Sequence, residues 1–395
     1  MKIAIFCESY LAQTNSVETH VSILASGLKK LGHEVLVVTS DLETEECYEE
    51  QGVLLCPARI SGSVYGQSAK KSKLAYLKER LEEFAPEIVH LVTFEEIGAA
   101  GLDYALQLDL PIAATVLDLS NALNGFDGNR AVNLFTKSYC RSTLKKVISF
   151  ADVVAAVSPK IIDTMNELGV GCKLTSIPLC IDSALFRPDC AGGHQIAAMK
   201  KRLSLENKTG VVTVSNLEQL EETGRLLEQW AEVISLNDPL QLIVVGSGKA
   251  LTELGNKAQL LGISSQVTFA GRIPHEEIGL CYCTCSAYLS ASQSNLIKTS
   301  VCEAIACGLP AILQSGSASC DIVTEGVNGF LYDHSQRMAE LLKKLTKLDE
   351  KTNVAMRKLV SKTAVNLTPE NLAKAVVSCY KKAKDEHYVK SKLKE

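Results

Sequence analysis

Residues 289–313 read LSASQSNLIKTSVCEAIACGLPAIL and decide the fold. Their pattern predicts the end of a buried strand, a polar turn, a helix of small residues, a break at Gly308 to Pro310 and a second buried strand. One carboxylate, Glu303, lies inside the apolar run of that helix. An acid in such a run needs a polar partner or a cleft to face. The stretch therefore predicts a strand–helix–strand unit with an acidic side chain at a site.

The same alternation of strands and helices extends along the chain in two series. The first series has short apolar runs at 2–6, 34–39, 88–91, 111–116 and 153–157, and a helical pattern at 17–31. The second has strand patterns at 210–214, 240–245, 267–270, 286–290 and 310–313, and helical patterns at 220–236, 337–347 and 369–382. This rhythm predicts an α/β fold with parallel sheets and right-handed crossovers.

The domain boundaries follow from a change of character near residue 185, where turns replace the alternation. We expect a first Rossmann-like domain at 1–185, a linker at 186–204 and a second Rossmann-like domain at 205–365. A closing helix and a charged, frayed tail are expected at 366–395. Doubly wound domains bind ligands at the carboxyl ends of their strands, so we expect the two domains to face each other across a cleft.

Composition narrows the class of protein. A hydrophobic content of 46% and a charged content of 22% are typical of a globular protein, and the net charge of −4 gives no reason to expect nucleic acid as a partner. The chain has 14 cysteines and no recognisable secretory leader, so we expect reduced thiols in the cytoplasm. Cys281, Cys283 and Cys285 would share one face of an extended segment. No second ligand pair accompanies them, so small buried residues are favoured over a metal site.

Several short motifs support one interpretation of the whole chain. They are Glu303 with Ala306-Cys307-Gly308-Leu309-Pro310, the turn Asn328-Gly329-Phe330-Leu331, Gly246-Ser247-Gly248 after a strand, Gly271-Arg272-Ile273-Pro274 and Pro178-Leu179-Cys180-Ile181-Asp182. Together they resemble the retaining GT-B glycosyltransferases of family four. The opening segment 6–41 is similar to the branch that includes bacterial diacylglycerol glucosyltransferases. The resemblance covers nearly the whole chain and implies two Rossmann-like domains facing across a cleft.

The resemblance also implies a nucleotide-sugar site. In the family's E-x₇-E segment the second Glu holds the ribose, and this position is Glu303. The first Glu lies near the sugar and diphosphate, and here it is Asn295. The turn with Gly246 and Gly248, and the segment with Arg272 and Ile273, would approach the nucleotide. Ser16 stands in the loop where the nearest branch usually has glycine.

The positions that carry catalysis in the family are substituted. Asn216 stands where an Arg would hold the diphosphate, and Glu221 or Glu222 stands near the usual Lys. Fixed positive charge lowers the barrier for a leaving diphosphate. Arg225 is the only base between residue 216 and Lys249, so it becomes the candidate replacement.

The first domain also lacks the family's catalytic His, because residues 113–118 contain none. Asp118 or Asp127 could serve as an acid or base instead. His90 matches a His seen in the family, although a satisfied histidine at a strand end is the alternative.

Two functions of different class remain open. If active, the resemblance implies transfer of a hexose from a nucleotide-sugar, a UDP-sugar by preference, to a lipid or glycan acceptor, with no metal or other cofactor. The alternative is a catalytically silent paralogue that acts as partner or regulator of an active glycosyltransferase. A Rossmann dehydrogenase is disfavoured because no G-x-G-x-x-G follows the first strand.

A basic helix is predicted at 130–148. It contains Arg130, Lys137, Arg141, Lys145 and Lys146 and no acid. Three of these bases recur every four residues and so share a stripe. The stripe is either a solvated face of the first domain or a patch for anionic lipid, which would hold the protein at the inner face of the membrane.

Overall fold

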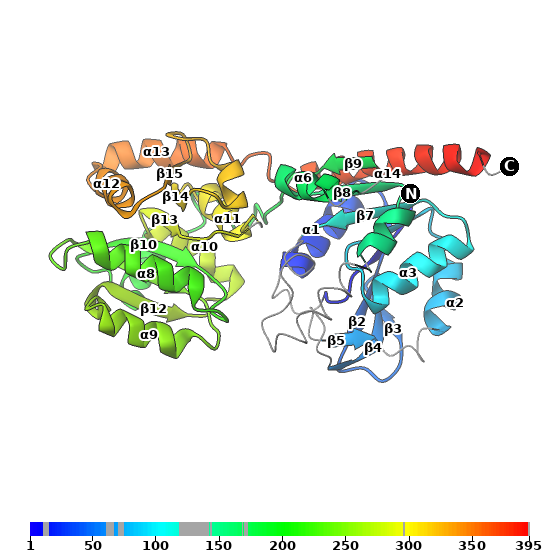
Figure 1. Ribbon diagram of the computed structural model, residues 1–395, viewed down its shortest axis with the longest axis horizontal. Helices are drawn as coiled ribbons and strands as arrows, with labels where there is room; N and C mark the ends of the chain where they lie inside the picture. The colour runs from blue at the N-terminus through cyan, green and yellow to red at the C-terminus, as the bar shows by residue number, and fades with distance from the viewer. Residues whose placement is uncertain are drawn as a thin grey trace. The chain divides into compact units, whose positions relative to one another are not determined.

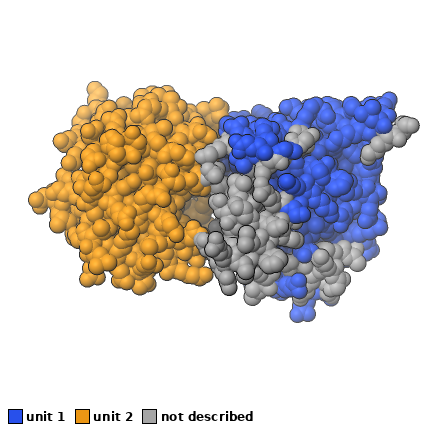
Figure 2. All heavy atoms as spheres, viewed as in Figure 1, with its two compact units in different colours: residues 1–180, 368–395 blue, residues 181–367 orange. Residues whose placement is uncertain are grey.

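The computed structural model describes residues 1–10, 16–60, 67–69, 75–117, 142, 144–167, 169, 173–294 and 297–393 (Figure 1). The chain divides into two compact units, residues 1–180 with 368–395 and residues 181–367, which Figure 2 shows in separate colours. The second unit thus contains the segment predicted as a linker, and part of that segment forms helix α7 (Gly193–Arg202). Residues 368–395 of the segment predicted to close the chain belong to the first unit.

Unit 1 is built on a mostly parallel sheet with the strand order β3-β4-β2-β1-β6-β7-β8-β9, and β5 pairs with β4. Its strands are β1 (Lys2–Phe6), β2 (Glu34–Asp41), β3 (Tyr48–Glu50), β4 (Val53–Ile60), β5 (Gln67–Ala69), β6 (Ile88–Leu91), β7 (Ile112–Val116), β8 (Val153–Ala156) and β9 (Lys173–Ser176). Its helices include α1 (Ser16–Lys30), α2 (Ala75–Phe84), α3 (Glu96–Gln107), α6 (Pro159–Glu167) and α14 (Pro369–Lys392). β1, β6, β7 and β8 are buried along almost their whole length, as expected for strands covered on both faces.

Helix α14 returns from the second unit to pack on the first. The Thr368 hydroxyl caps the helix by accepting a hydrogen bond from the backbone N–H of Asn371 at 3.3 Å. Pro369 occupies the first turn, where the N–H that proline lacks would have no partner within the helix. At Gly27 of α1 a Cβ would lie 2.6 Å from the Pro369 carbonyl oxygen, so glycine allows the close packing of α1 on α14. The prediction of a frayed tail is wrong for the described residues, because α14 continues to Lys392.

Unit 2 has a fully parallel sheet with the order β12-β11-β10-β13-β14-β15. Its strands are β10 (Thr209–Val214), β11 (Leu240–Val245), β12 (Val267–Gly271), β13 (Ala287–Ser290), β14 (Ala311–Gln314) and β15 (Gly329–Tyr332). Besides α7, its helices are α8 (Glu221–Val233), α9 (Leu251–Leu260), α10 (His275–Thr284), α11 (Thr299–Ala306), α12 (Ser335–Thr346) and α13 (Glu350–Lys362). The strand order reverses between β10 and β13, which makes their carboxyl ends the switch point of this sheet.

Residues 289–313, with which the sequence analysis began, fold as predicted into the end of β13, helix α11 and strand β14. Gly308 ends the helix with φ +77, and a Cβ there would lie 2.6 Å from the Arg357 carbonyl oxygen, so glycine is required. The expectation of an extended segment at Cys281 and Cys283 is wrong: both lie in α10, and Cys285 is its C-cap. The α/β fold class with two doubly wound sheets is confirmed.

Candidate functional site

The switch point of unit 2 lies where residues 215–220 follow β10 and residues 291–298 follow β13. Ligands of doubly wound sheets bind at such points, because the two connections diverge there. The first connection leads into α8 and the second into α11, which carries Glu303. Asn295, predicted to lie near the sugar, is outside the described residues.

Glu303 is buried, with 8% of its surface exposed. The Tyr282 hydroxyl donates a hydrogen bond to its Oε2 at 3.0 Å. Burial raises the pKa of Glu303 to about 7, and the Tyr282 hydrogen bond opposes this rise. Among the residues that the structure describes, no second donor bonds to this carboxylate, so Oε1 can accept from a ligand. Of the two alternatives predicted for this acid, a polar partner or a cleft to face, the polar partner is confirmed.

Tyr282 belongs to an aromatic group that supports α11. Its ring centroid lies 6.3 Å from that of Phe186 and 6.4 Å from that of Tyr288. The Tyr288 hydroxyl in turn lies 2.8 Å from Ser300 Oγ on α11. Sequence reasoning missed Tyr282, since nothing in a short apolar helix indicates which hydroxyl will meet an acid on another helix.

The α8 side of the switch point has different chemistry. Glu222, in the first turn of α8, forms an ion pair with Lys298, which lies just before α11. The Arg225 guanidinium donates to the Ala291 carbonyl oxygen at 3.3 Å. Asn216 is exposed. Arg225 and Lys298 are therefore engaged within the protein, and Lys298 is a base that sequence reasoning did not single out.

The glycine turn after β11 packs against the connection after β10. A Cβ at Gly246, whose φ is +145, would lie 2.0 Å from the Ser215 carbonyl oxygen, and one at Gly248 would lie 2.2 Å from the Leu217 carbonyl carbon. Both glycines are thus required for backbone packing at the switch point. Their approach to a nucleotide stays a prediction, as does that of the following segment, where Arg272 is exposed and Ile273 is buried.

His90 lies in the core of unit 1, on β6. Its Nδ1 lies 2.8 Å from the Tyr380 hydroxyl and its Nε2 lies 2.7 Å from Thr115 Oγ1, so both ring nitrogens are engaged. Burial lowers the pKa of His90 to about 3, which keeps the ring neutral. His90 joins α14 to the sheet, which is the structural alternative considered for it.

The side chains of the remaining predicted site residues of unit 1 lie outside the described part of the chain. Asp118 and Asp127 lie outside the described residues, and Ser16 begins α1 without a described side chain. Of the basic segment 130–148, residue 142 and residues 144–148 are described, and Lys145 and Lys146 there are exposed. Lys137 and Arg141 of the predicted stripe lie outside this part.

Two family models match the chain. The model described as Glycosyltransferase Family 4 matches residues 17–185, and the model described as Glycosyl transferases group 1 matches residues 195–362. With the two doubly wound sheets, these matches define the class of protein. The chain belongs to the GT-B glycosyltransferases of family four.

Known proteins of this class resemble the chain over most of its length. It is 23% identical over 390 residues to the alpha-monoglucosyldiacylglycerol synthase of Streptococcus pneumoniae, a match that covers 96% of this chain and 85% of the relative. It is 25% identical to the enzyme of that name from Acholeplasma laidlawii, covering 87% of each. Anabaena HepE, solved in complex with UDP and glucose, has a TM-score of 0.72 at 17% identity and covers 96% of this chain and 99% of its own. This structural likeness confirms the GT-B fold.

None of the described helices combines the length and apolarity needed to cross a membrane.

Proposed function

We propose that this chain binds a nucleotide-sugar, with a UDP-sugar as the donor, at the switch point of unit 2 and transfers its hexose to a lipid or glycan acceptor. The observation that carries the proposal is the Glu303 carboxylate, which is buried and held by Tyr282 at one oxygen while Oε1 has no donor from the described residues. Two neighbouring hydroxyls, as in a ribose, are matched to a carboxylate held in this way. Glu303 is the ribose-binding residue of this proposal.

The likeness to known proteins supports the choice of donor and acceptor. UDP is bound in the HepE structure, and the relatives at 23% and 25% identity are named for a glucosylated diacylglycerol. Other relatives are named GDP-mannose-dependent alpha-mannosyltransferases, so GDP-mannose is the competing donor. The names of these relatives specify alpha-linked products, which supports retention of configuration.

The diphosphate would need a positive charge as it leaves, and Lys298 is the base placed to supply it. In this proposal Lys298 exchanges its Glu222 partner for the diphosphate, while the N-terminus of α11 adds backbone donors. Neither a metal nor another cofactor is part of the proposed reaction.

A catalytically silent paralogue, acting as partner or regulator of an active glycosyltransferase, is the second candidate. Two contacts favour it: Lys298 is paired with Glu222, and Arg225 is bonded to the Ala291 carbonyl oxygen. The family resemblance adds that a neutral amide, Asn216, stands where a base is expected. Such a protein would bind a nucleotide weakly and would not turn it over.

Titration with UDP, UDP-glucose and GDP-mannose, followed by assays of donor hydrolysis and of transfer to diacylglycerol vesicles, separates the two candidates. The proposal predicts binding of UDP-glucose in preference to GDP-mannose, with release of UDP and formation of a glycolipid. Binding without turnover would favour the silent paralogue. If the folded protein bound no nucleotide, both candidate functions would be contradicted, together with the assignment of Glu303 as the ribose-binding residue.

Peripheral contact with the cytoplasmic face of a membrane is proposed through the basic segment 130–148. Exposed Lys145 and Lys146 support it within the described part of the segment. Co-sedimentation should then require anionic vesicles and weaken with salt, and binding that ignores lipid charge would reject the membrane contact.

A further inference from the structure

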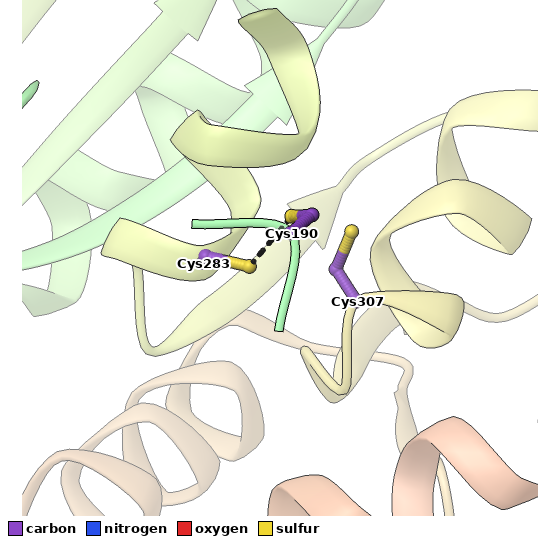
Figure 3. Close-up of side chains that lie close together, drawn as sticks. All are labelled: Cys190, Cys283 and Cys307. Carbon is purple, nitrogen blue, oxygen red and sulfur yellow. Dashed lines mark hydrogen bonds between the residues drawn. The ribbon is translucent and has the colours of Figure 1, made fainter. Parts of the chain in front are cut away.

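Three cysteine thiols of unit 2 converge although they are far apart in sequence. Cys190 comes from the loop before α7, Cys283 from the last turn of α10 and Cys307 from the C-cap of α11 (Figure 3). The Sγ atoms of Cys190 and Cys283 are 3.2 Å apart, and all three Sγ atoms lie within 4.8 Å of one another. Cys307 is fully buried, whereas the other two are half-buried.

The surrounding structure holds these thiols in place. At Gly279 of α10 a Cβ would lie 2.9 Å from the Leu185 carbonyl oxygen and 3.4 Å from Cys190 Sγ, so glycine admits the loop that carries Cys190. The Arg357 guanidinium donates to the carbonyl oxygens of Cys285 at 2.8 Å and Cys307 at 3.3 Å. One side chain of α13 thus fixes the ends of both helices that carry the other two thiols.

The spacing and the charges suit a soft cation. Zn²⁺–S bonds of about 2.3 Å in a tetrahedral arrangement place sulfur atoms roughly 3.8 Å apart, which is compatible with the observed cluster. Three thiolates around Zn²⁺ carry one net negative charge, which Arg357 would balance.

We propose that Cys190, Cys283 and Cys307 form a binding site for a thiophilic cation, with Zn²⁺ as the ion, that joins the loop before α7 to the ends of α10 and α11. Its role is structural in the first place, because the metal would cross-link three segments of unit 2. Cys307 lies one helical turn after Glu303 on α11, so an occupied site also fixes the helix that carries the proposed ribose ligand. The site does not depend on donor binding or on catalysis.

Zn²⁺ competition against a chromophoric chelator tests the site in the full-length, reduced and metal-free protein. We expect one equivalent of Zn²⁺ to be retained and the two half-buried thiols, Cys190 and Cys283, to become protected from a thiol reagent. Cys190→Ala removes a ligand on a surface loop and should weaken Zn²⁺ binding by more than the roughly 10- to 100-fold that loss of a supporting partner costs. Cys320→Ala, a half-buried cysteine of unit 2 outside the cluster, is the matched control and should retain Zn²⁺ like the unmodified protein.

Co²⁺ provides a second readout, since thiolate-to-metal charge-transfer absorption should appear with the unmodified protein and Cys320→Ala and decrease with Cys190→Ala. Circular dichroism checks that each variant is folded. Cys307→Ser removes a second ligand and should also weaken Zn²⁺ binding. Because Cys307 is fully buried, this variant is the one at risk of not folding, and Cys190→Ala then still tests the site. Failure to retain Zn²⁺, or equal affinity in Cys190→Ala, would overturn the proposal. Formation of a Cys190–Cys283 disulfide on mild oxidation of a protein that does not bind Zn²⁺ would overturn it in favour of a redox pair.

Discussion

The two sides of the switch point in unit 2 differ in how they hold their acids. On the α11 side, Glu303 is buried and bonded to the neutral hydroxyl of Tyr282, whose ring lies 6.4 Å from that of Tyr288. On the α8 side, Glu222 is half-buried and joined to Lys298 by charge. The α11 side therefore keeps a carboxylate oxygen with no donor among the described residues, whereas on the α8 side the charge of Lys298 is paired with that of Glu222. Under the proposed function, the α11 side would bind the ribose and the α8 side would limit the contribution of the diphosphate.

The largest expected effect concerns the pH dependence of stability. The pKa of Glu303 is raised to about 7 in the folded protein from an ordinary 4.5, so the folded state binds the proton more tightly. Stability from this group is fully present below about pH 4.5 and is lost as pH rises through about 7. Relative to Glu303→Gln, the free energy of unfolding should fall by about 3 kcal/mol across that window. Urea unfolding of both proteins from pH 4.5 to 8 measures it, and parallel profiles would contradict the description of the α11 side.

The next effect concerns nucleotide affinity. Glu303→Ala should lower the affinity for UDP by about 1.5–3 kcal/mol, because it removes hydrogen bonds to a charged acceptor. Calorimetry measures the change, and Glu340→Ala, an exposed acid of α12, is the control that should leave the affinity unaltered. Unchanged UDP affinity in a well-folded Glu303→Ala protein would contradict the assignment of Glu303 as the ribose-binding residue.

A smaller effect tests the α8 side. Glu222→Gln releases Lys298 from its ion pair, so the preference for UDP over uridine should rise by about tenfold, or roughly 1.4 kcal/mol. Glu221→Gln changes an exposed neighbour by the same one charge and should produce a smaller rise. Equal changes in the two variants would show that overall charge, and not the Lys298 pair, limits the contribution of the diphosphate.

Sequence predicted most of the architecture because buried parallel strands are short apolar runs between turn residues. Residues 2–6 and 88–91 are strands with the predicted bounds. The C-terminal tail was predicted to fray because it is charged, but Lys384 pairs with Glu87 at 2.6 Å and Lys390 with Asp152 at 2.9 Å. Contacts with residues distant in sequence hold this helix in place, and the local sequence pattern does not indicate such contacts.

For the candidate site, the sequence likewise predicted individual residues but not the residues that they contact. That Glu303 needs a polar partner follows from an acid in an apolar helix. The identity of the partner does not, because Tyr282 is 21 residues away on another helix. The Lys298–Glu222 pair joins residues 76 apart, and the thiol cluster joins Cys190 to Cys283, 93 apart. Each of these contacts is made by the tertiary fold, so spacing along the chain could not indicate it.

The most direct test of the central claim compares uridine and UDP as ligands of the unmodified protein by calorimetry. If Glu303 recognises the ribose and Lys298 must give up its Glu222 partner to hold the diphosphate, both ligands bind. The lost ion pair then limits the gain from the diphosphate to less than about a hundredfold in affinity, or 2.8 kcal/mol. A larger gain would contradict the account, because it would require a base that holds the diphosphate without first losing a partner within the protein, as Lys298 and Arg225 must.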